Sequence, residues 1–419
     1  MRKIIVSGGK RLSGEVEIGG SKNAALPILF GGIVTADVCL FSGLPRVSDV
    51  LRTLEILRYL GARISFLKNG DVRVDYRKLS EGLPPASLTC EIRGSTYLLG
   101  AMLARFGRAR LAGAGGCDFG SRPIDQHLLG FEALGATVEE CDGVLTVRAG
   151  EGLRGNRFRL AMPSVGASAN LLLAATAVDG VTIIENAAAE PHVVALAEFL
   201  QQAGAAIEGV GSDRLTVCGG RALHGVHHAV IPDMIEAGTY LAFGVACGGS
   251  VTVRSVCPSH LGALLDAFRR MGVAVAVGER EVCVSTNGRY RGTDVTTGPY
   301  PAFPTDLHPQ MAALFCLGDR AVCGGSVTES VFSSRFRYAA ALAEMGAEYR
   351  IDGRCIHLTP TLLHPAKVAS PDLRGGAALL VAALATAGTS EITNAFTVGR
   401  GYEHLEEKLT ALGALVRVL

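Results

Sequence analysis

Along this chain, apolar side chains recur first at helical spacing and then at strand spacing. A helix is predicted over residues 47–60, where valine and leucine return every three or four positions. Gly61 follows, at the position just past a helix C-terminus where a left-handed backbone favours glycine. The runs at 62–66 and 72–74 then alternate between apolar and polar residues around a turn. This order predicts an amphipathic helix followed by a β-hairpin.

The same helix, glycine and hairpin recur along the whole chain. The glycines that end the predicted helices are Gly61, Gly135, Gly204, Gly272, Gly346 and Gly413, which are 67 to 74 residues apart. A fixed period of this size indicates repeated supersecondary units, here six. The sixth copy ends after residues 414–418, one strand short. We expect the opening strand, Lys3–Val6, to supply the missing partner, which places both ends of the chain in one domain.

A second predicted helix precedes each amphipathic one and is rich in small apolar residues, as in stretches 23–30, 97–103, 167–177 and 377–387. A helix that is apolar all round is a buried one. We therefore predict an α/β protein of two domains, each with three buried helices sheathed by hairpins. The length of 419 residues agrees with two domains. The predicted first domain is 22–230, and the second is 1–21 plus 231–419.

Composition narrows the class of protein. The 40 basic residues nearly balance the 39 acidic ones, which argues against a nucleic-acid partner. No apolar run reaches the length of about 18 residues that a membrane span requires, and the N-terminus resembles neither a signal nor a transit peptide. The 11 cysteines are scattered without a C-x-x-C pair. We interpret Cys218, Cys283 and Cys316 as reduced core residues of a cytoplasmic protein without a zinc site.

The starts of the buried helices differ from their apolar bodies. Free N–H groups and the helix dipole favour anions at such positions. Serine, threonine and aspartate there are also ordinary N-caps, and capping alone accounts for many of them. Capping does not account for Lys22, Arg93 and Arg374, because a cation at a helix start is unfavourable for the helix. These three residues indicate a bound anion.

Three further arginines, Arg122, Arg335 and Arg400, are predicted to open amphipathic helices. A single arginine at a helix start is more often a solvated surface residue. Their recurrence at equivalent positions favours a shared role, and a substrate with a phosphate and a carboxylate would use guanidinium groups that each bind two oxygens.

Cys117 differs from the other cysteines, because four glycines surround it in the stretch 112–122, which has no regular pattern. We interpret this stretch as a mobile loop in which Arg122 favours the thiolate. A reactive thiol on a closing loop fits an acid or a nucleophile. The alternative is an incidental exposed thiol.

With these residues in view, the chain resembles the UDP-N-acetylglucosamine branch of the enolpyruvyl transferase family over essentially its whole length. The motifs that carry the resemblance are Gly19–Ile28, Gly116-Cys117, Arg122–Asp125, Ser164–Ala167, Ile184–Ala187, Pro301–Asp306, Asp372–Arg374 and Arg400–Glu403. Together they are highly specific, whereas each alone would be weak.

The resemblance implies a fold, an activity and roles for particular residues. The implied fold is the pair of inside-out α/β barrels, with the active site in the cleft between the two domains. The implied reaction moves enolpyruvate from phosphoenolpyruvate to UDP-N-acetylglucosamine, the first committed step of peptidoglycan synthesis, without a metal or organic cofactor. Lys22, Arg122 and Arg400 would hold phosphoenolpyruvate with help from Arg93, and Asn23 and Asp306 would grip the sugar.

Further roles follow from the same resemblance. Asp306 would act as the base, with Lys22 catalytic beside it, and Cys117 would be the acid and the residue that fosfomycin attacks. The nucleotide would be received by Arg122, Pro123, Ile124, Asp125, Gln126, Ser164, Val165, Gly166 and Val331, with Asp372 and Arg374 also in the substrate-binding set.

Some positions depart from the family pattern. Met234 and Gly399 stand where the family usually has an arginine and an aspartate, and Ser333 and Ala189 replace a glutamate and a basic residue. Two alternatives therefore stay open. One is a catalytically silent UDP-sugar-binding paralogue, against which Cys117, Asp306 and Lys22 are all present. The other is the shikimate-pathway enolpyruvyl transferase, which lacks the cysteine loop.

Overall fold

The computed structural model describes residues 3–113, 124–321, 324–333 and 335–419. They form two compact units. The described residues of unit 1 fall in Met1–Gly19 and Pro232–Leu419, and those of unit 2 fall in Gly20–Cys117 and Pro123–Ile231. The chain thus enters unit 2 after its first two strands and returns to unit 1 at Pro232.

Unit 2 is built around helices α1 (Lys22–Thr35), α4 (Tyr97–Phe106) and α6 (Val165–Ala175), which pack against one another. Its other helices are α2 (Ser48–Tyr59), α3 (Ala86–Thr89), the 3₁₀ turn η1 (Arg93–Thr96), α5 (Asp125–Ala133) and α7 (Pro191–Gln202). Its strands are β3 (Val38–Ser42), β4 (Arg63–Phe66), β5 (Val72–Asp75), β6 (Arg108–Ala112), β7 (Thr137–Cys141), β8 (Val144–Arg148), β9 (Arg157–Arg159), β10 (Val181–Glu185), β11 (Ala206–Glu208), β12 (Arg214–Cys218) and β13 (His227–Ala229).

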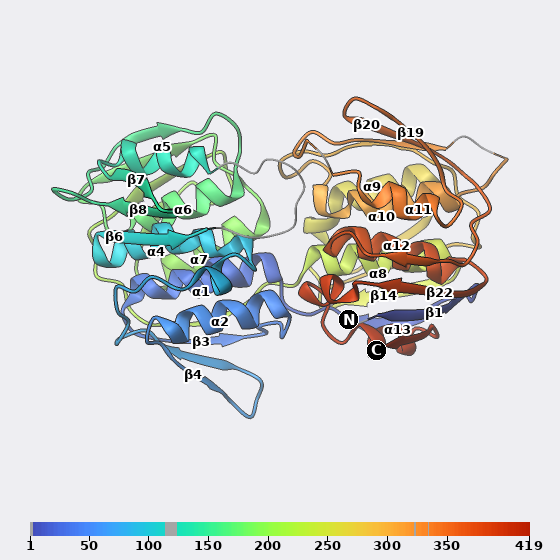
Figure 1. Cartoon of the computed structure of the whole chain (residues 1–419), viewed down its shortest axis with the longest axis horizontal. Helices are drawn as coiled ribbons and strands as arrows, with labels where there is room; N and C mark the ends of the chain where they lie inside the picture. The colour runs from blue at the N-terminus through green and yellow to red at the C-terminus, as the bar shows by residue number, and fades with distance from the viewer. Residues whose placement is uncertain (1–2, 114–123, 322–323, 334) are drawn as a thin grey trace. The chain divides into compact units, whose positions relative to one another are not determined.

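Unit 1 repeats this plan around α8 (Met234–Cys247), α10 (His308–Leu317) and α12 (Leu373–Ala385) (Figure 1). Its other helices are η2 (Pro258–Leu261), α9 (Gly262–Met271), η3 (Thr305–Leu307), α11 (Tyr338–Ala343), η4 (Ala395–Arg400) and α13 (Leu405–Ala411). Its strands are β1 (Ile4–Gly8), β2 (Ser13–Glu17), β14 (Ser250–Arg254), β15 (Ala274–Val277), β16 (Glu281–Ser285), β17 (Asp294–Thr296), β18 (Gly325–Thr328), β19 (Glu348–Asp352), β20 (Cys355–Thr359), β21 (Lys367–Ala369), β22 (Gly388–Thr393) and β23 (Leu415–Val418).

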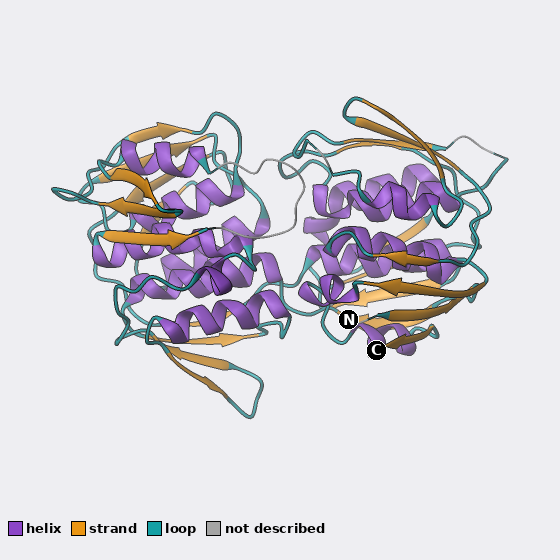
Figure 2. Ribbon diagram, in the orientation of Figure 1, coloured by secondary structure: helices purple, strands orange, loops and turns teal. Residues whose placement is uncertain are grey.

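Among the described residues, each unit has three small sheets along the outer sides of its helices (Figure 2). The orders in unit 2 are β13-β3-β5-β4, β6-β8-β7 and β11-β12-β10-β9, and those in unit 1 are β15-β16-β14-β2, β17-β18-β20-β19 and β21-β22-β1-β23. Within a sheet, a hairpin pairs antiparallel with the strand that follows an interior helix. In the last sheet β1 pairs antiparallel with both β22 and β23. The predicted closure of the sixth repeat by the opening strand is confirmed.

The interior helices are buried as predicted. In α12 every residue from Leu373 to Leu384 is buried, and α8 and α10 are covered nearly as completely. Within the described residues, no helix combines the length and the apolar character needed to cross a membrane.

The repeated glycines adopt the backbone that their position predicts. All six, from Gly61 to Gly413, have a positive φ, between 85° and 106°. At all six repeats a short strand begins two residues after the glycine. The glycines therefore allow the chain to turn from each amphipathic helix directly into its hairpin.

The interpretation of two cysteines as core residues is wrong. Cys316 is buried in α10, but Cys218 is exposed and Cys283 is half-buried. In β12 the inward positions are Leu215 and Val217, so Cys218 lies on the opposite face. Cys283 alternates in the same way with its neighbours in β16. Apolar neighbours in a strand do not place a residue on the buried face.

The two ends of α9 give a matched test of the glycine role. Gly272 follows the helix with a φ of 85°, whereas Gly262 opens it with a φ of −46°, and an added Cβ would meet nothing within 4 Å at either. We expect Gly272→Ala to lower the free energy of unfolding by about 1 kcal/mol, because alanine strains at positive φ.

The same substitution at Gly262 should raise the free energy of unfolding by up to about 1 kcal/mol, because alanine restricts the unfolded chain and suits a helix. Urea unfolding of both variants measures the difference. Equal effects of the two substitutions would contradict the assigned backbone role.

Candidate active site

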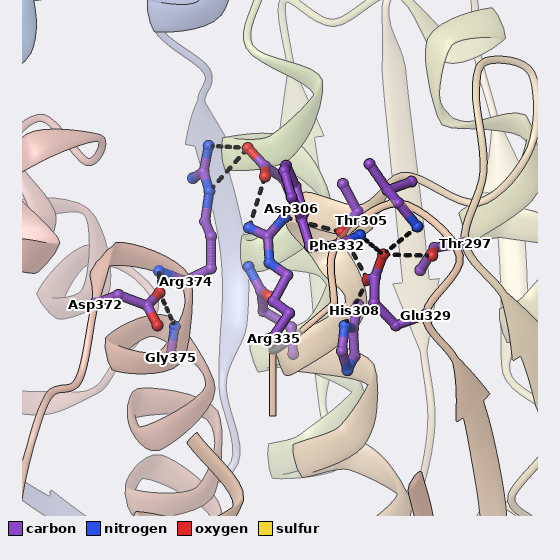
Figure 3. Close-up of polar contacts among 12 residues, drawn as sticks. Thr297, Thr305, Asp306, His308, Glu329, Phe332, Arg335, Asp372, Arg374 and Gly375 are labelled. Carbon is purple, nitrogen blue, oxygen red and sulfur yellow. Dashed lines mark hydrogen bonds and ion pairs between the residues drawn. The ribbon is translucent and has the colours of Figure 1, made fainter. Parts of the chain in front are cut away.

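One carboxylate in unit 1 lies between two guanidinium groups (Figure 3). Asp306 Oδ1 accepts a hydrogen bond from Arg335 Nη2 at 2.7 Å. Its Oδ2 accepts from Arg374 through Nη2 at 2.9 Å and Nε at 3.2 Å. Such charge-assisted bonds are stronger than neutral ones and fix direction as well as position. The carboxylate is therefore held in one orientation by both of its oxygens.

Burial differs sharply within this trio. The side chains of Arg335 and Arg374 are only 2% and 3% exposed, whereas that of Asp306 is 26% exposed. Burial acts to lower the pKa of Arg374, but the charge of Asp306 outweighs it and raises the pKa above its usual value. The three groups carry one net positive charge. The exposed part of the trio is the carboxylate of Asp306, an oxygen base held in a fixed direction.

Two of the three residues lie at the starts of interior helices. Asp306 lies in η3, which leads directly into α10, and Arg374 is the second residue of α12. Asp372 caps α12, because its Oδ1 accepts from the backbone N–H groups of Arg374 and Gly375. Arg374, which the sequence marks as an indication of a bound anion, pairs in this structure with a carboxylate of the protein itself.

Tyr402 ties the arginine to the two neighbouring interior helices. Its hydroxyl accepts from Arg374 Nη1 at 3.3 Å and lies 2.9 Å from Thr239 Oγ1 of α8. Gln310 of α10 donates to the same Thr239 oxygen. This buried hydroxyl cluster joins α8, α10 and α12 at the end that carries Asp306.

Behind Asp306 lies a second, fully buried carboxylate. Glu329 is 1% exposed, and its Oε2 accepts from Thr305 Oγ1 at 2.7 Å and from His308 Nδ1 at 3.0 Å. Burial acts to raise the pKa of Glu329, but the hydrogen bonds from His308 and Thr305 outweigh it and lower the pKa to about 2. Glu329 is therefore ionised at neutral pH.

In unit 2, predicted residues occupy the starts of α1 and of the 3₁₀ turn η1. Lys22 is the first residue of α1, and its Nζ lies 3.4 Å from Asp49 Oδ2 in the first turn of α2. Asn23 follows Lys22 in the same turn, and Arg93 opens η1 ahead of α4. Ser21 caps α1 by accepting from the Ala24 N–H at 3.3 Å.

The stretch expected to receive the nucleotide begins at α5. Ile124 precedes α5, Asp125 is its first residue, and Gln126 Oε1 accepts from the Ala161 N–H at 2.7 Å. Ser164 caps α6, which begins with Val165 and Gly166.

A buried histidine joins these two stretches. An added Cβ on Gly166 would come within 2.9 Å of the His127 ring, so glycine is required for this approach. Asn170 Nδ2 donates to His127 Nδ1 at 2.8 Å. Because Nδ1 is the acceptor, His127 is neutral and carries its proton on Nε2.

Other predictions meet a mixed outcome. Cys117, Arg122 and Pro123 lie outside the described residues. Val331 donates its N–H to Glu329 Oε1 at 2.7 Å. The prediction that Arg335 and Arg400 open amphipathic helices is wrong: Arg335 precedes α11 by three residues, and Arg400 ends η4. In each case the apolar residues keep helical spacing through the preceding turn, but the α-helix itself begins later, at Tyr338 for α11 and at Leu405 for α13.

Sequence reasoning did not single out Glu329, His308, His127 or Tyr402. His127 directly follows Gln126, and Tyr402 lies within the motif Arg400–Glu403 without having been given a role. Nothing in the local pattern marks Glu329, which follows an ordinary strand, β18. Within the described part of the chain, no cluster of histidine, cysteine, aspartate and glutamate is arranged to hold a metal ion.

His127 should make stability depend on pH. Burial, helped by the cation of Arg93, lowers the pKa of His127 from 6.5 to about 4. As the pH falls, the imidazole of His127 therefore gains a proton in the unfolded chain before it does so in the folded chain. The contribution of neutral His127 to the free energy of unfolding is thus complete above pH 6.5 and is lost as the pH falls toward 4. We expect His127→Gln to reduce the loss of unfolding midpoint between pH 7 and pH 5, measured by chemical denaturation.

His224, which is exposed in the same unit, provides the control. His224→Gln should keep the wild-type dependence on pH. A His127→Gln protein with an undiminished acid-induced loss would show that His127 does not contribute to it.

Comparison with known proteins agrees with this geometry. Residues 6–409 match the family described as EPSP synthase (3-phosphoshikimate 1-carboxyvinyltransferase). The enolpyruvyl transferase NikO from Streptomyces tendae superimposes with a TM-score of 0.89 at 27% identity, covering 100% of this chain and 98% of that one. EPSP synthase from Acinetobacter baumannii, at 18% identity and a TM-score of 0.74 with both chains fully covered, shares the fold.

Relatives by sequence are closer. UDP-N-acetylglucosamine 1-carboxyvinyltransferase 2 of Carboxydothermus hydrogenoformans is 43% identical, and 99% of each chain is covered. UDP-N-acetylglucosamine 1-carboxyvinyltransferase 3 of Caldanaerobacter subterraneus subsp. tengcongensis is 41% identical over 100% of both chains. The chain therefore belongs to the enolpyruvyl transferase family, in the branch of the UDP-N-acetylglucosamine 1-carboxyvinyltransferases.

Proposed function

We propose that this carboxyvinyltransferase moves the enolpyruvyl group of phosphoenolpyruvate to the 3-hydroxyl of UDP-N-acetylglucosamine and releases phosphate. The names of its full-length relatives support this acceptor. The reaction is the first committed step of peptidoglycan synthesis and requires no cofactor.

The observation that carries the proposal is the anchored carboxylate of Asp306. A base for a sugar hydroxyl must be fixed in direction and must also reach the substrate. Arg335 and Arg374 bind both oxygens of Asp306 while a quarter of its side chain stays exposed.

The remaining roles follow from the family resemblance. Lys22, Arg122 and Arg400 bind phosphoenolpyruvate with Arg93 at its phosphate, and Asn23 binds the sugar with Asp306. Residues 122–126 and 164–166 receive the uridine diphosphate together with Val331. Asp372 and Arg374 complete the substrate-binding set.

The chemistry is an addition followed by an elimination. Asp306 takes the proton of the 3-hydroxyl while the hydroxyl oxygen of the sugar adds to the central carbon of phosphoenolpyruvate. Cys117 gives a proton to the terminal carbon, and Lys22 helps to neutralise the charge on the substrate. The resulting tetrahedral ketal then loses a proton and phosphate, which re-forms the enol ether.

We place the enzyme in the cytoplasm, where its two substrates are found. Cell-wall synthesis, and with it cell shape and division, would depend on its product. Cys117 would also make it a target of fosfomycin, whose epoxide is opened by a thiolate.

The acceptor can be identified by a phosphate-release assay. We expect phosphate release only when phosphoenolpyruvate and UDP-N-acetylglucosamine are both present, because the hydroxyl must add before phosphate can leave. Asp306→Asn should lower the rate by about 10²-fold or more, since a general base contributes that much.

Shikimate 3-phosphate serves as the competing acceptor in the same assay. Release with it instead of the UDP-sugar would overturn the acceptor assignment. A protein that binds UDP-N-acetylglucosamine but releases no phosphate would support the silent paralogue.

Fosfomycin labelling tests the role of Cys117. We expect intact-protein mass spectrometry to show one adduct on the wild type and none on Cys117→Ser. Cys90→Ser is the matched control, because Cys90 is exposed and should not be the labelled thiol. An adduct that persists in Cys117→Ser would contradict the assignment.

A further inference from the structure

Glu329 holds a set of hydrogen bonds that the proposed chemistry does not use. Its Oε2 accepts from Thr305 and His308, and its Oε1 accepts from Thr297 Oγ1 at 2.9 Å and from two backbone N–H groups (Figure 3). An ionised carboxylate accepts hydrogen bonds and donates none, so every partner must direct a proton toward it. Glu329 thereby fixes the orientation of each of these groups.

On the Oε2 side, this orientation is passed on to Asp306. The single hydroxyl proton of Thr305 is committed to Glu329, which leaves its oxygen lone pairs to accept from other donors. Arg335 Nη1 donates to that oxygen at 2.8 Å, and Arg335 Nη2 donates to Asp306 Oδ1 at 2.7 Å. A continuous chain of hydrogen bonds thus runs from Glu329 through Thr305 and Arg335 to Asp306.

The Oε1 side reaches the same arginine by another route. The N–H groups of Val331 and Phe332 donate to Oε1 at 2.7 and 3.0 Å, which fixes the turn after β18. The ring of Phe332 then lies 5.1 Å from the guanidinium carbon of Arg335. Arg335 is therefore oriented by Thr305 at its edge and by Phe332 at its face.

A neutral histidine completes the surroundings of Glu329. His308 is fully buried and donates from Nδ1 to Glu329, while its Nε2 lies 2.6 Å from the Tyr338 hydroxyl. Burial lowers the pKa of His308 in spite of the opposing charge of Glu329. The histidine therefore leaves the negative charge of Glu329 in place.

We propose that Glu329 is a positioning residue of the transferase reaction, which fixes Arg335 through Thr305 and the 331–332 turn and so aims Asp306 at the acceptor hydroxyl. It does this without contact with substrate. The inference rests on the proposed function, since it concerns the base assigned there.

Two substitutions interrupt the chain of hydrogen bonds from Glu329 to Asp306 at different residues. Glu329→Gln keeps the shape but replaces one acceptor oxygen with a donor. Thr305→Val keeps the shape but removes the hydroxyl between Glu329 and Arg335. We expect each to lower kcat by about 10- to 100-fold with KM changed much less, because a misaligned catalytic group costs rate on that order.

Glu329 and Thr305 should act as one unit, because they belong to the same chain of hydrogen bonds. The double variant Glu329→Gln/Thr305→Val should be no slower than the worse single variant, since either change breaks the same chain. Thr305→Ser, which restores the hydroxyl, should recover most of the rate lost in Thr305→Val. Glu391→Gln, at a surface ion pair with Lys3, is the control for loss of a carboxylate.

The profile of kcat against pH separates positioning from direct proton transfer. Its acidic limb should persist in Glu329→Gln, because Asp306 remains the base. Thermal unfolding of each variant, measured in parallel, checks that the protein is folded at the assay temperature.

The outcomes distinguish this inference from the proposed function. An active wild type with unchanged kcat in Glu329→Gln and Thr305→Val would overturn the positioning role alone, and so would independent, multiplicative losses in the double variant. A wild type that releases no phosphate with UDP-N-acetylglucosamine would overturn the proposed function first, and the inference with it.

Discussion

Helices that are apolar on every side are stable in water only where other parts of the chain cover them completely, and both units are organised by this constraint. The small sheets along the outer sides of the helices provide the cover. Charged side chains of these helices are then restricted to the helix ends, where the first N–H groups need acceptors. Ser21, Ser164, Asp233 and Asp372 supply them as N-caps. The same ends are where charged side chains gather in the sequence.

Burying a cation at a helix start is unfavourable twice, because the charge loses water and faces the positive end of the dipole. Arg374 is subject to both penalties. Asp306 offsets them, because its Oδ2 accepts two hydrogen bonds from the guanidinium group. Arg335, equally buried, binds the other oxygen. Asp306 alone does not balance two guanidinium groups, and the ionised carboxylate of Glu329 lies one hydroxyl away from Arg335, through Thr305. The two arginines are therefore buried among fixed carboxylates of the protein itself.

Much of the fold was predictable because its signals are local or periodic. The six glycines, the buried helices and the closure of the last sheet by β1 all follow from the spacing of residues along the chain. The site was predictable only as a set of residues. Arg374 and Asp306 are 68 positions apart, and no spacing rule pairs them. Glu329 has no signature at all, because its role lies in tertiary contacts. An apolar neighbourhood was likewise insufficient to place Cys218, whose face is set by its alternation with Leu215 and Val217.

The motif Pro301–Asp306 shows how a recognised sequence and an unrecognised network depend on each other. A 3₁₀ turn has three residues per turn, so successive side chains point in directions about 120° apart. In η3 this separates three tasks: Leu307 packs into the core, Thr305 reaches Glu329, and Asp306 reaches the two arginines. A shift of the turn by one residue would move Thr305 away from Glu329 and Asp306 away from the two arginines. The buried carboxylate behind the turn is what holds the register, so the residue that contacts substrate and the residue that fixes its direction must be understood together.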